Sequence, residues 1–254
     1  MRPKCFVYLL PEYFCPPSNP FAAVVIDTFR FTTTATKALA SGAASVLVAK
    51  DIEQAHCLYE VLGKPRPLLC GERHCNKIEG FDLGNSPLEF TKDQVAQRTL
   101  IFTTTNGTRA VQACANADSI FLGCLRNRSS LCQLLNLEND LDIHIVCAGT
   151  DGNIALEDSI TAGAIVKQLV SQYEIGSDAT NLSLQAWLAI SSTLESGDAF
   201  HIPLPLLQAQ GGHNLVAQGY ERDIEYAIEL DVEPAVAKLS ANSPAPSFTL
   251  SRVA

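Results

Sequence analysis

The sequence predicts an α/β protein with a layered α/β/α arrangement and a mostly parallel or mixed sheet. Two observations lead to this fold class. Short runs rich in valine and isoleucine, typical of strands buried on both faces, alternate with segments whose apolar residues recur at helical spacing. In addition, one plan of apolar strand, polar turn and helix appears three times, at residues 22–42, 99–122 and 142–169. The recurrence suggests a fold built from repeated strand–turn–helix units.

The composition is that of a folded protein, and no clear linker divides the chain into domains. The chain has 254 residues, of which 47% are hydrophobic and 18% charged, so it can bury a sizeable core. Its formal net charge of −9 would repel a nucleic-acid backbone, and no run of basic residues offsets that charge. The sequence also lacks the run of about 18 apolar residues that a membrane-spanning helix needs. We therefore expect one domain over residues 1–254, with neither a nucleic acid nor a membrane as partner.

The N-terminal segment and the cysteines both point to a cytoplasmic location. Pro11, Glu12 and Pro16 interrupt the first apolar stretch before a signal sequence could form. The 9 cysteines are odd in number and none of them makes a CxxC motif. We expect free thiols in a reducing compartment.

The first strand–turn–helix unit is the easiest to follow along the chain. Its strand ends at Ile26, and its helix ends near Gly42, a residue that can take a left-handed cap. After a strand at 45–49, Asp51 is expected to cap a helix that runs to about Leu62. A strand at 67–70 then opens a polar loop over residues 71–90, whose interleaved apolar residues predict that it folds back and packs: Ile78, Phe81 and Leu83.

The second and third units follow the same plan, and the rest of the chain departs from it. Residues 34–45 can be laid over residues 108–119, which suggests an internal duplication within about 22–170, although two βα units would look alike anyway. The sequence predicts a mainly helical segment over about residues 171–240. The tail from Ser240 onward is expected to be frayed or extended.

The turns after the three strands carry groups suited to an oxyanion, at the strand ends where α/β sheets bind ligands. The first two turns offer hydroxyls, backbone N–H groups and an arginine, which together can cradle a phosphate or sulfonate. Threonine and asparagine are also ordinary helix caps, so each turn alone favours capping, and only their correspondence favours a site. The candidates are Asp27, Arg30, Thr32, Thr33 and Thr34 in the first turn and Thr104, Asn106, Gly107, Thr108 and Arg109 in the second.

Several carboxylates are candidates for metal binding or catalysis. Asp27 directly follows an apolar strand, where a metal ligand, a nucleophile or a simple capping aspartate can stand. Glu157 and Asp158 begin the third helix, where acidic residues commonly offset the helix dipole; as metal ligands they would have to face the same pocket. His74 and Cys75 are adjacent, but their spacing matches no usual zinc pattern.

Known phosphate-handling motifs are missing from the sequence. It contains no GxxxxGK[ST] loop, no GxGxxG, no Cys-x5-Arg and no GxSxG. Asp140 and Asp142 form a DxD, but they precede their strand, which misplaces them for an aspartyl-phosphate enzyme.

Four segments taken in order resemble the 2-phosphosulfolactate phosphatase family: VVIDTFRFTTTATKAL, CGERHCNKIEGFDLGNSPLEF, TTTNGTRAV and VCAGTDGNIALEDSITAGAI. The similarity covers about residues 22–170 and continues more weakly through residues 219–231. It departs from the family at His74 and Cys75, where the family usually has two glycines, at the residues flanking Arg30, and at residues 154–155. The resemblance implies a Mg2+-dependent phosphatase that converts 2-phospho-3-sulfolactate and water into 3-sulfolactate and phosphate, a step toward coenzyme M.

The resemblance also implies site residues. The substrate carries phosphate, carboxylate and sulfonate groups, so an acidic protein must meet it with a local positive pocket, and our candidates for that pocket are Arg30, Arg73, Lys77 and Arg109. Asn85 joins them as a substrate contact, and Asp27 with Arg30 form the expected catalytic pair. The candidate Mg2+ ligands are Asp27, Glu72, Asp82, Glu157 and Asp158.

Alternatives stay open at this point. Asp27 could bind the metal, act as general base or form a phosphoenzyme; in-line attack by a metal-held water is preferred because the usual covalent motifs are missing. The protein could instead be a phosphatase for another small phosphorylated acid, or a non-catalytic sensor of an anionic metabolite. A homo-oligomer is compatible with the sequence.

Overall fold

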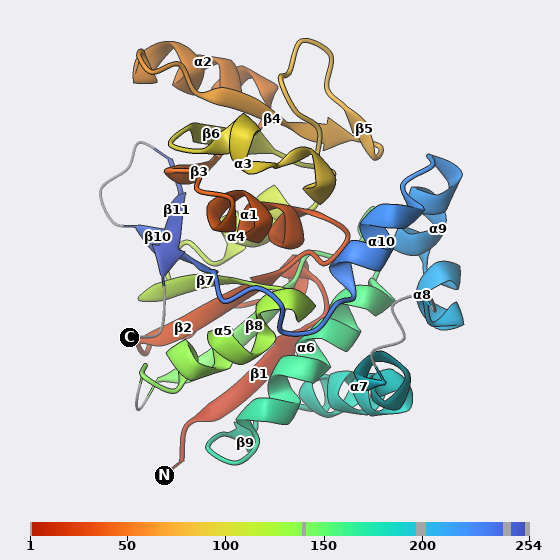
Figure 1. Ribbon diagram of the computed structural model, residues 1–254. Helices are drawn as coiled ribbons and strands as arrows, with labels where there is room; N and C mark the ends of the chain where they lie inside the picture. Colours follow the sequence, from red (N-terminus) through yellow and green to blue (C-terminus); the bar gives the residue numbers. More distant parts are fainter. Residues whose placement is uncertain (1, 139–140, 197–201, 241–244, 252–254) are drawn as a thin grey trace.

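The computed structural model describes residues 2–138, 141–196, 202–240 and 245–251 (Figure 1). The strands are β1 (Lys4–Tyr8), β2 (Phe21–Ile26), β3 (Ser45–Val48), β4 (Leu68–Arg73), β5 (Asn76–Lys77), β6 (Thr99–Thr103), β7 (Ser119–Gly123), β8 (Asp142–Cys147), β9 (Glu174–Ile175), β10 (Val236–Ser240) and β11 (Ser247–Ser251). The helices are α1 (Phe31–Ala40), α2 (Ile52–Leu62), α3 (Lys92–Val95), α4 (Gly107–Ala113), α5 (Arg128–Leu135), α6 (Leu156–Leu169), α7 (Asp178–Glu195), α8 (Leu204–Gln208), α9 (Gln210–Ala217) and α10 (Glu221–Ala227).

The strands form one mixed sheet in the order β5-β4-β6-β3-β11-β10-β7-β2-β8-β1-β9. Two mostly parallel wings make up this sheet. The β6 wing contains β5, β4, β6 and β3, and the β2 wing contains β7, β2, β8, β1 and β9. The hairpin β10–β11 joins the wings by antiparallel pairing to β7 and β3. The predicted α/β class with a mostly parallel sheet is confirmed.

The first two strand–turn–helix units are interleaved across the wings. The unit β2–α1–β3 and the unit β6–α4–β7 exchange strands, because β2 pairs with β7 while β3 pairs with β6. Each unit therefore contributes one strand to each wing. The internal duplication suggested by the sequence stays a hypothesis. In that hypothesis, each copy contributes its first strand to one wing and its second strand to the other.

Helices α1 and α4 lie between the two wings (Figure 1). Phe31 and Leu39 of α1 and Val111 of α4 pack in one buried cluster with Phe102 of the β6 wing and Val25 of the β2 wing. As a result, the N-terminal ends of α1 and α4 come close together, although β2 and β6 are far apart in strand order.

Helices α2, α5 and α6 cover the outer faces of the wings, whereas Val95 of α3 belongs to the buried cluster between them. Leu58 of α2 packs against Ile101 on the β6 wing. Leu131 of α5 and Ile165 of α6 pack against Val24 on the β2 wing. Helices α7 to α10 form a separate buried cluster around Trp187, Leu206, Leu215 and Ile224, which also contacts Ile160 of α6. No helix within the described ranges is long and apolar enough to cross a membrane.

Several local expectations are confirmed. Asp51 Oδ1 accepts the N–H of Gln54 at 2.7 Å and so caps α2, and Gly63, just beyond that helix, has φ 66°. The loop after β4 folds back, since Ile78 and Phe81 are buried. All nine cysteines are free.

The C-terminal tail has a different role from the one expected. Its residues 247–251 are extended, but they form the central strand β11, and Phe248 is fully buried in the cluster between the wings. Residues 241–244 and 252–254 of that tail, as well as Asp140 of the DxD pair, lie outside the described residues.

Candidate functional site

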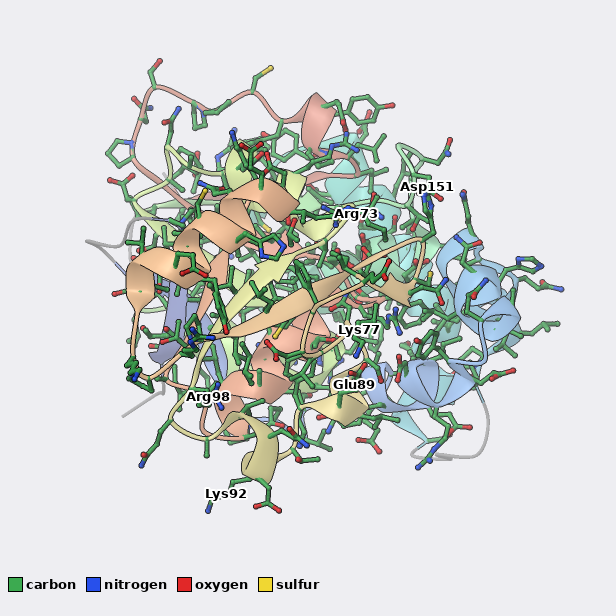
Figure 2. The ribbon with its side chains drawn as sticks, turned by 90° about the horizontal axis from the view of Figure 1, so that it is seen from above. Arg73, Lys77, Glu89, Lys92, Arg98 and Asp151 are labelled. Carbon is green, nitrogen blue, oxygen red and sulfur yellow. The ribbon has the colours of Figure 1, made fainter. Side chains whose placement is uncertain are left out.

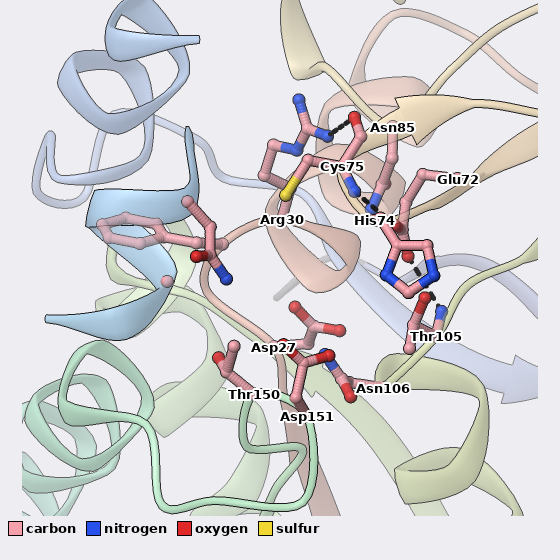
Figure 3. Close-up of a pocket in the computed structure, with 13 residues that line it drawn as sticks. Asp27, Arg30, Glu72, His74, Cys75, Asn85, Thr105, Asn106, Thr150 and Asp151 are labelled. Atoms are coloured by element: carbon pink, nitrogen blue, oxygen red, sulfur yellow. Dashed lines mark hydrogen bonds between the residues drawn. The ribbon is translucent and has the colours of Figure 1, made fainter. Parts of the chain in front are cut away.

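A pocket lies at the carboxyl ends of β2, β6 and β8, where they meet the turn between β4 and β5 and the start of α9 (Figure 3). Six separate stretches of the chain therefore contribute to it, the sixth being the loop that carries Asn85. The lining residues are Asp27, Phe29, Arg30, Glu72, His74, Cys75, Asn85, Thr105, Asn106, Thr150, Asp151, Gly211 and Asn214.

Asp27 stands at the first position after β2 and is held on both sides. Its Oδ1 accepts the N–H of Phe31 at 3.2 Å, so it caps the start of α1. Its backbone N–H donates to Thr32 Oγ1 at 3.1 Å, and the Thr32 hydroxyl donates back to the Asp27 carbonyl at 2.9 Å. The side chain is only 7% exposed and lines the pocket. Both interpretations of Asp27 from the sequence, a cap and a site residue, therefore describe the same side chain.

Gly107 brings the second turn against the first. A Cβ at this position would lie 2.7 Å from Asp27 Oδ2 and 2.5 Å from Phe31 Cδ1. Only a glycine permits α4 to begin this close to Asp27. The structure thus brings the two predicted turns together.

Three carboxyl groups are buried near one another. Burial, followed by the charge of Asp158, raises the pKa of Asp27 well above its ordinary value. Burial raises the pKa of Asp158 to about 8, with the Glu157 charge as the next cause. Burial also raises the pKa of Glu157 to about 7, against the hydrogen bond it accepts from its own backbone. Three acidic groups in such a space cannot all ionise at low cost unless a cation or protons offset their charge.

Asp158 and Glu157 differ in whether both of their carboxylate oxygens have hydrogen-bond partners. Asp158 accepts the N–H of Thr28 at 2.8 Å and the N–H of Gly149 at 3.1 Å, one on each oxygen. Glu157 Oε2 is buried and has no hydrogen-bond partner among the described residues, while its Oε1 lies where a Cβ of Gly211 would be. Glu157 is therefore the carboxylate with an unused oxygen.

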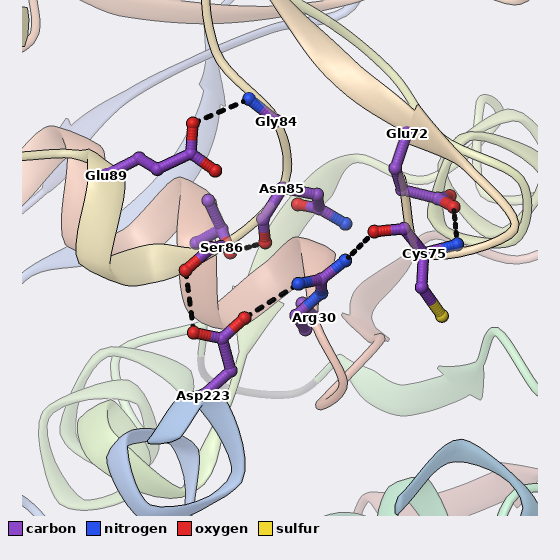
Figure 4. Close-up of polar contacts among 9 residues, drawn as sticks. Arg30, Glu72, Cys75, Gly84, Asn85, Ser86, Glu89 and Asp223 are labelled. Atoms are coloured by element: carbon purple, nitrogen blue, oxygen red, sulfur yellow. Dashed lines mark hydrogen bonds and ion pairs between the residues drawn. The ribbon is translucent and has the colours of Figure 1, made fainter. Parts of the chain in front are cut away.

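Arg30 is part of a buried ionic network (Figure 4). Its Nη1 donates to Asp223 Oδ2 at 2.7 Å, and the two side chains are 3% and 1% exposed. Its Nη2 donates to the carbonyl of Cys75 at 2.7 Å, and its guanidinium lies 4.3 Å from the centre of the Tyr220 ring. Asp223 also accepts the Ser86 hydroxyl at 2.6 Å. The charge of Arg30 is therefore already balanced inside the protein.

Glu72 fixes the wall opposite Arg30. Its Oε2 accepts the N–H of Cys75 at 2.9 Å and its Oε1 accepts the N–H of Thr105 at 2.8 Å. The carboxylate thereby joins the β4–β5 turn to the β6–α4 turn, and both of its oxygens are in use.

Three polar atoms of the pocket lining are buried without a hydrogen-bond partner in the described part of the chain: Asn85 Oδ1, Thr105 Oγ1 and Asn106 Oδ1. Buried polar atoms are nearly always paired with protein, water or a ligand. Their shared position indicates a site built to hold a polar ligand.

Six of the predicted charged residues are not in the pocket lining: Arg73, Lys77, Asp82, Arg109, Glu157 and Asp158. Glu157 and Asp158 are the buried carboxyls described above, and Figure 2 labels Arg73 and Lys77 among the other four. Arg73 donates to the carbonyl of Glu72 at 2.7 Å and to Thr103 Oγ1 at 3.1 Å, Lys77 is exposed on β5, and the exposed Arg109 pairs with Glu12. The exposed Asp82 accepts the N–H of Leu69 at 2.8 Å. Adjacent strand residues face opposite ways, so Glu72 in the pocket places Arg73 outside it.

The predicted threonine hydroxyls mostly hold the backbone. Thr33 donates to the carbonyl of Thr28 at 2.9 Å and Thr34 to that of Asn85 at 2.8 Å. Thr104 and Thr108 bond to each other's backbone N–H groups at 3.0 and 3.3 Å. These side chains shape the two turns instead of lining the pocket.

Several lining residues were not predicted as site residues. Thr150 and Asp151 stand in the third strand-to-helix turn, where the same positional argument could have found them. His74 and Cys75 were considered only as zinc ligands. Gly211 and Asn214 of α9 gave no signal in the sequence, because nothing local marks a distant helix as part of a site.

No group of three or more His, Cys, Asp or Glu side chains among the described residues is arranged to hold a metal ion. This does not conflict with Mg2+, which usually keeps several waters and is bound by one or two carboxylates together with substrate phosphate oxygens. Asp27 and Glu157 are the carboxylates that fit such a partial site, because Asp27 lines the pocket and Glu157 has a buried, unpartnered oxygen.

The known proteins that resemble this chain share one family description. The model of the 2-phosphosulpholactate phosphatase family matches residues 10–242. A probable 2-phosphosulfolactate phosphatase of Caldanaerobacter subterraneus is 39% identical over 218 residues, covering 85% of this chain and 86% of the relative. Proteins with the same description from Thermotoga maritima and Deinococcus radiodurans are each 35% identical, over 89% and 91% of this chain and 92% of each relative.

Proposed function

The chain belongs to the 2-phosphosulpholactate phosphatase family, and we propose that it is a phosphoric monoester hydrolase that converts 2-phospho-3-sulfolactate and water into 3-sulfolactate and phosphate, with Mg2+ as cofactor. The observation that carries the proposal is the position of Asp27. It stands at the end of a buried strand, lines a pocket with unpartnered polar atoms, and touches the second turn through Gly107.

The charge of the pocket supports a cation. Asp27, Glu72 and Asp151 line it, and Arg30, the one arginine in its lining among the described residues, is paired with Asp223. A phosphate dianion brought to this pocket alone would be repelled. We propose that Asp27 and Glu157 hold the Mg2+. When bound, it would offset charge on the phosphoryl oxygens and lower the pKa of bound water.

The protein's own groups would then position the substrate. The Thr105 hydroxyl and the side-chain NH2 groups of Asn85 and Asn106 would donate hydrogen bonds to phosphoryl oxygens. The unpartnered Asn85 Oδ1 and Asn106 Oδ1 can only accept, and would face water. Asp27 would orient the attacking water in line with the bond from phosphorus to the C2 oxygen. As that bond breaks, the leaving oxygen takes a proton given up by the attacking water and becomes the hydroxyl of 3-sulfolactate. The water oxygen stays on phosphorus in the released phosphate.

The test is phosphate release from a panel of small phosphorylated acids, measured with added Mg2+ and after exhaustive chelation. We expect turnover of 2-phospho-3-sulfolactate that is lost on chelation and restored by Mg2+. Preference for another member of the panel would make the protein a phosphatase of a different small acid. Binding of the panel without any phosphate release would make it a sensor, and full activity without metal would remove Mg2+ from the proposal. A small soluble substrate agrees with the expected cytoplasmic location, which stays a prediction.

A further inference from the structure

A second hollow adjoins the pocket on the side of α9. It is lined by His74, Cys75, Asp151, His213, Asn214, Ala217 and Gln218. Four of these residues, His74, Cys75, Asp151 and Asn214, also line the pocket. The two hollows therefore share a wall, and one ligand can extend from the first into the second.

The two hollows differ in charge. Within the part of the chain that the structure describes, three carboxylates line the pocket, whereas Asp151 is the one carboxylate in the lining of the second hollow. Against that one carboxylate stand two imidazoles and the side-chain amides of Asn214 and Gln218, all of which can donate hydrogen bonds. The pocket thus suits a cation with a phosphoryl group, and the second hollow suits an acid group.

Among the described residues, three side chains that line either hollow can carry positive charge: Arg30, His74 and His213. Arg30 already faces Asp223, the Cys75 carbonyl and the Tyr220 ring. In the described part of the chain, the two imidazoles are therefore the uncommitted groups that can bind the two acid groups a substrate carries besides its phosphate.

The turn that carries His74 is held in an unusual conformation. His74 and Cys75 have φ 52° and 65°, in the left-handed region that glycine favours. Such backbone persists where surrounding contacts determine it. Cys75 is fixed through Glu72 and Arg30, and the amide of Asn76 donates to the His74 carbonyl at 3.0 Å and to Gln218 at 3.2 Å. The last bond ties the turn to the end of α9, the helix that carries His213.

We propose that His74 and His213 bind a non-phosphoryl acid group of the substrate, its carboxylate or sulfonate, and are specificity-determining residues. This rests on the proposed function. The subsite lies in the second hollow, while the phosphoryl group occupies the pocket beside Asp27.

The test compares the wild-type protein with the double variant His74→Ala/His213→Ala by calorimetric titration in the presence of Mg2+. The probes are 3-sulfolactate and inorganic phosphate. We expect at least a tenfold loss of affinity for 3-sulfolactate in the double variant. Affinity for phosphate should change less than twofold in the single variant His213→Ala, because His213 lines only the second hollow. In turnover of 2-phospho-3-sulfolactate, KM should rise by a similar factor while kcat changes little. The matched control is His56→Ala, which removes an exposed histidine of α2 that lines neither hollow.

The outcomes separate the two proposals. Wild-type affinity of the double variant for 3-sulfolactate, or no binding of 3-sulfolactate by the wild type, overturns the subsite even if phosphate release continues. No phosphate release by the wild type overturns the proposed function. Because both histidines are exposed, the double variant should fold, and its thermal unfolding midpoint checks this. If it does not fold, the single variants His74→Gln and His213→Ala replace it.

Discussion

Removing Asp223 should destabilise the protein by about 3–5 kcal/mol, the range for breaking a buried ion pair by deleting one partner. The Arg30–Asp223 pair has an Nη1 to Oδ2 distance of 2.7 Å, and neither side chain is more than 3% exposed. In Asp223→Ala the guanidinium would stay buried with only the Cys75 carbonyl and the Tyr220 ring as partners. The Ser86 hydroxyl would lose its acceptor as well.

Thermal and urea unfolding measure the effect. For a protein of this size, each kcal/mol shifts Tm by roughly 2–4 °C, so we expect a fall of about 6–20 °C. The control is Glu12→Ala, which breaks an exposed pair with Arg109 and should change stability by less than about 1 kcal/mol. If Asp223→Ala is no less stable than Glu12→Ala, the reasoning from desolvation is wrong.

A double variant separates the buried charge from the lost packing. Replacing both partners of a buried ion pair by apolar residues is often neutral. Arg30→Met together with Asp223→Ala should therefore recover most of the stability lost in Asp223→Ala. Phosphatase activity should stay low, because Arg30 lines the pocket. Recovery of both stability and activity would show that Arg30 has no part in the reaction.

Three further predictions concern the pocket. Asp27→Asn removes the charge and keeps the shape of the side chain, so kcat for phosphate release should fall by roughly 10²–10⁴-fold. Near-normal kcat in a stable variant would remove Asp27 from the site. Gly107→Ala should destabilise the fold by about 1–3 kcal/mol in urea unfolding and lower activity, since its Cβ would lie 2.7 Å from Asp27 Oδ2; unchanged values would contradict the close approach. In metal-free protein, the free energy of unfolding should fall as pH rises from about 4 to about 8, because carboxyls whose pKa is raised by folding bind more protons in the folded chain than in the unfolded chain. Glu157→Gln should flatten that slope, and an unchanged slope in pH-dependent unfolding would place the protons elsewhere.

The parts of the site that the sequence could predict are those set by local rules. A carboxylate directly after a buried strand belongs at the carboxyl edge of the sheet, and Asp27 is there. Asp51 and Gly63 bound their helix because a cap and a left-handed stop depend on neighbouring residues only. The side chains of adjacent strand residues point to opposite faces of a sheet, and this rule could also have been used. With Glu72 facing the pocket, it excludes Arg73 from the expected positive pocket.

The rest depended on pairings between distant parts of the chain. Arg30 and Asp223 are 193 positions apart. The sequence therefore shows an arginine beside a run of threonines, and it does not show that an aspartate balances the charge of this arginine in the folded protein. The position of His213 also depends on a distant pairing. It lines the second hollow because α9 packs near the β4–β5 turn. With its expected arginines and lysine paired or turned away, the pocket is more acidic than the sequence suggested. An acidic pocket can accept a phosphorylated substrate only when a cation or bound protons offset its charge. Loss of the predicted positive residues therefore favours the proposed Mg2+, which stays a prediction.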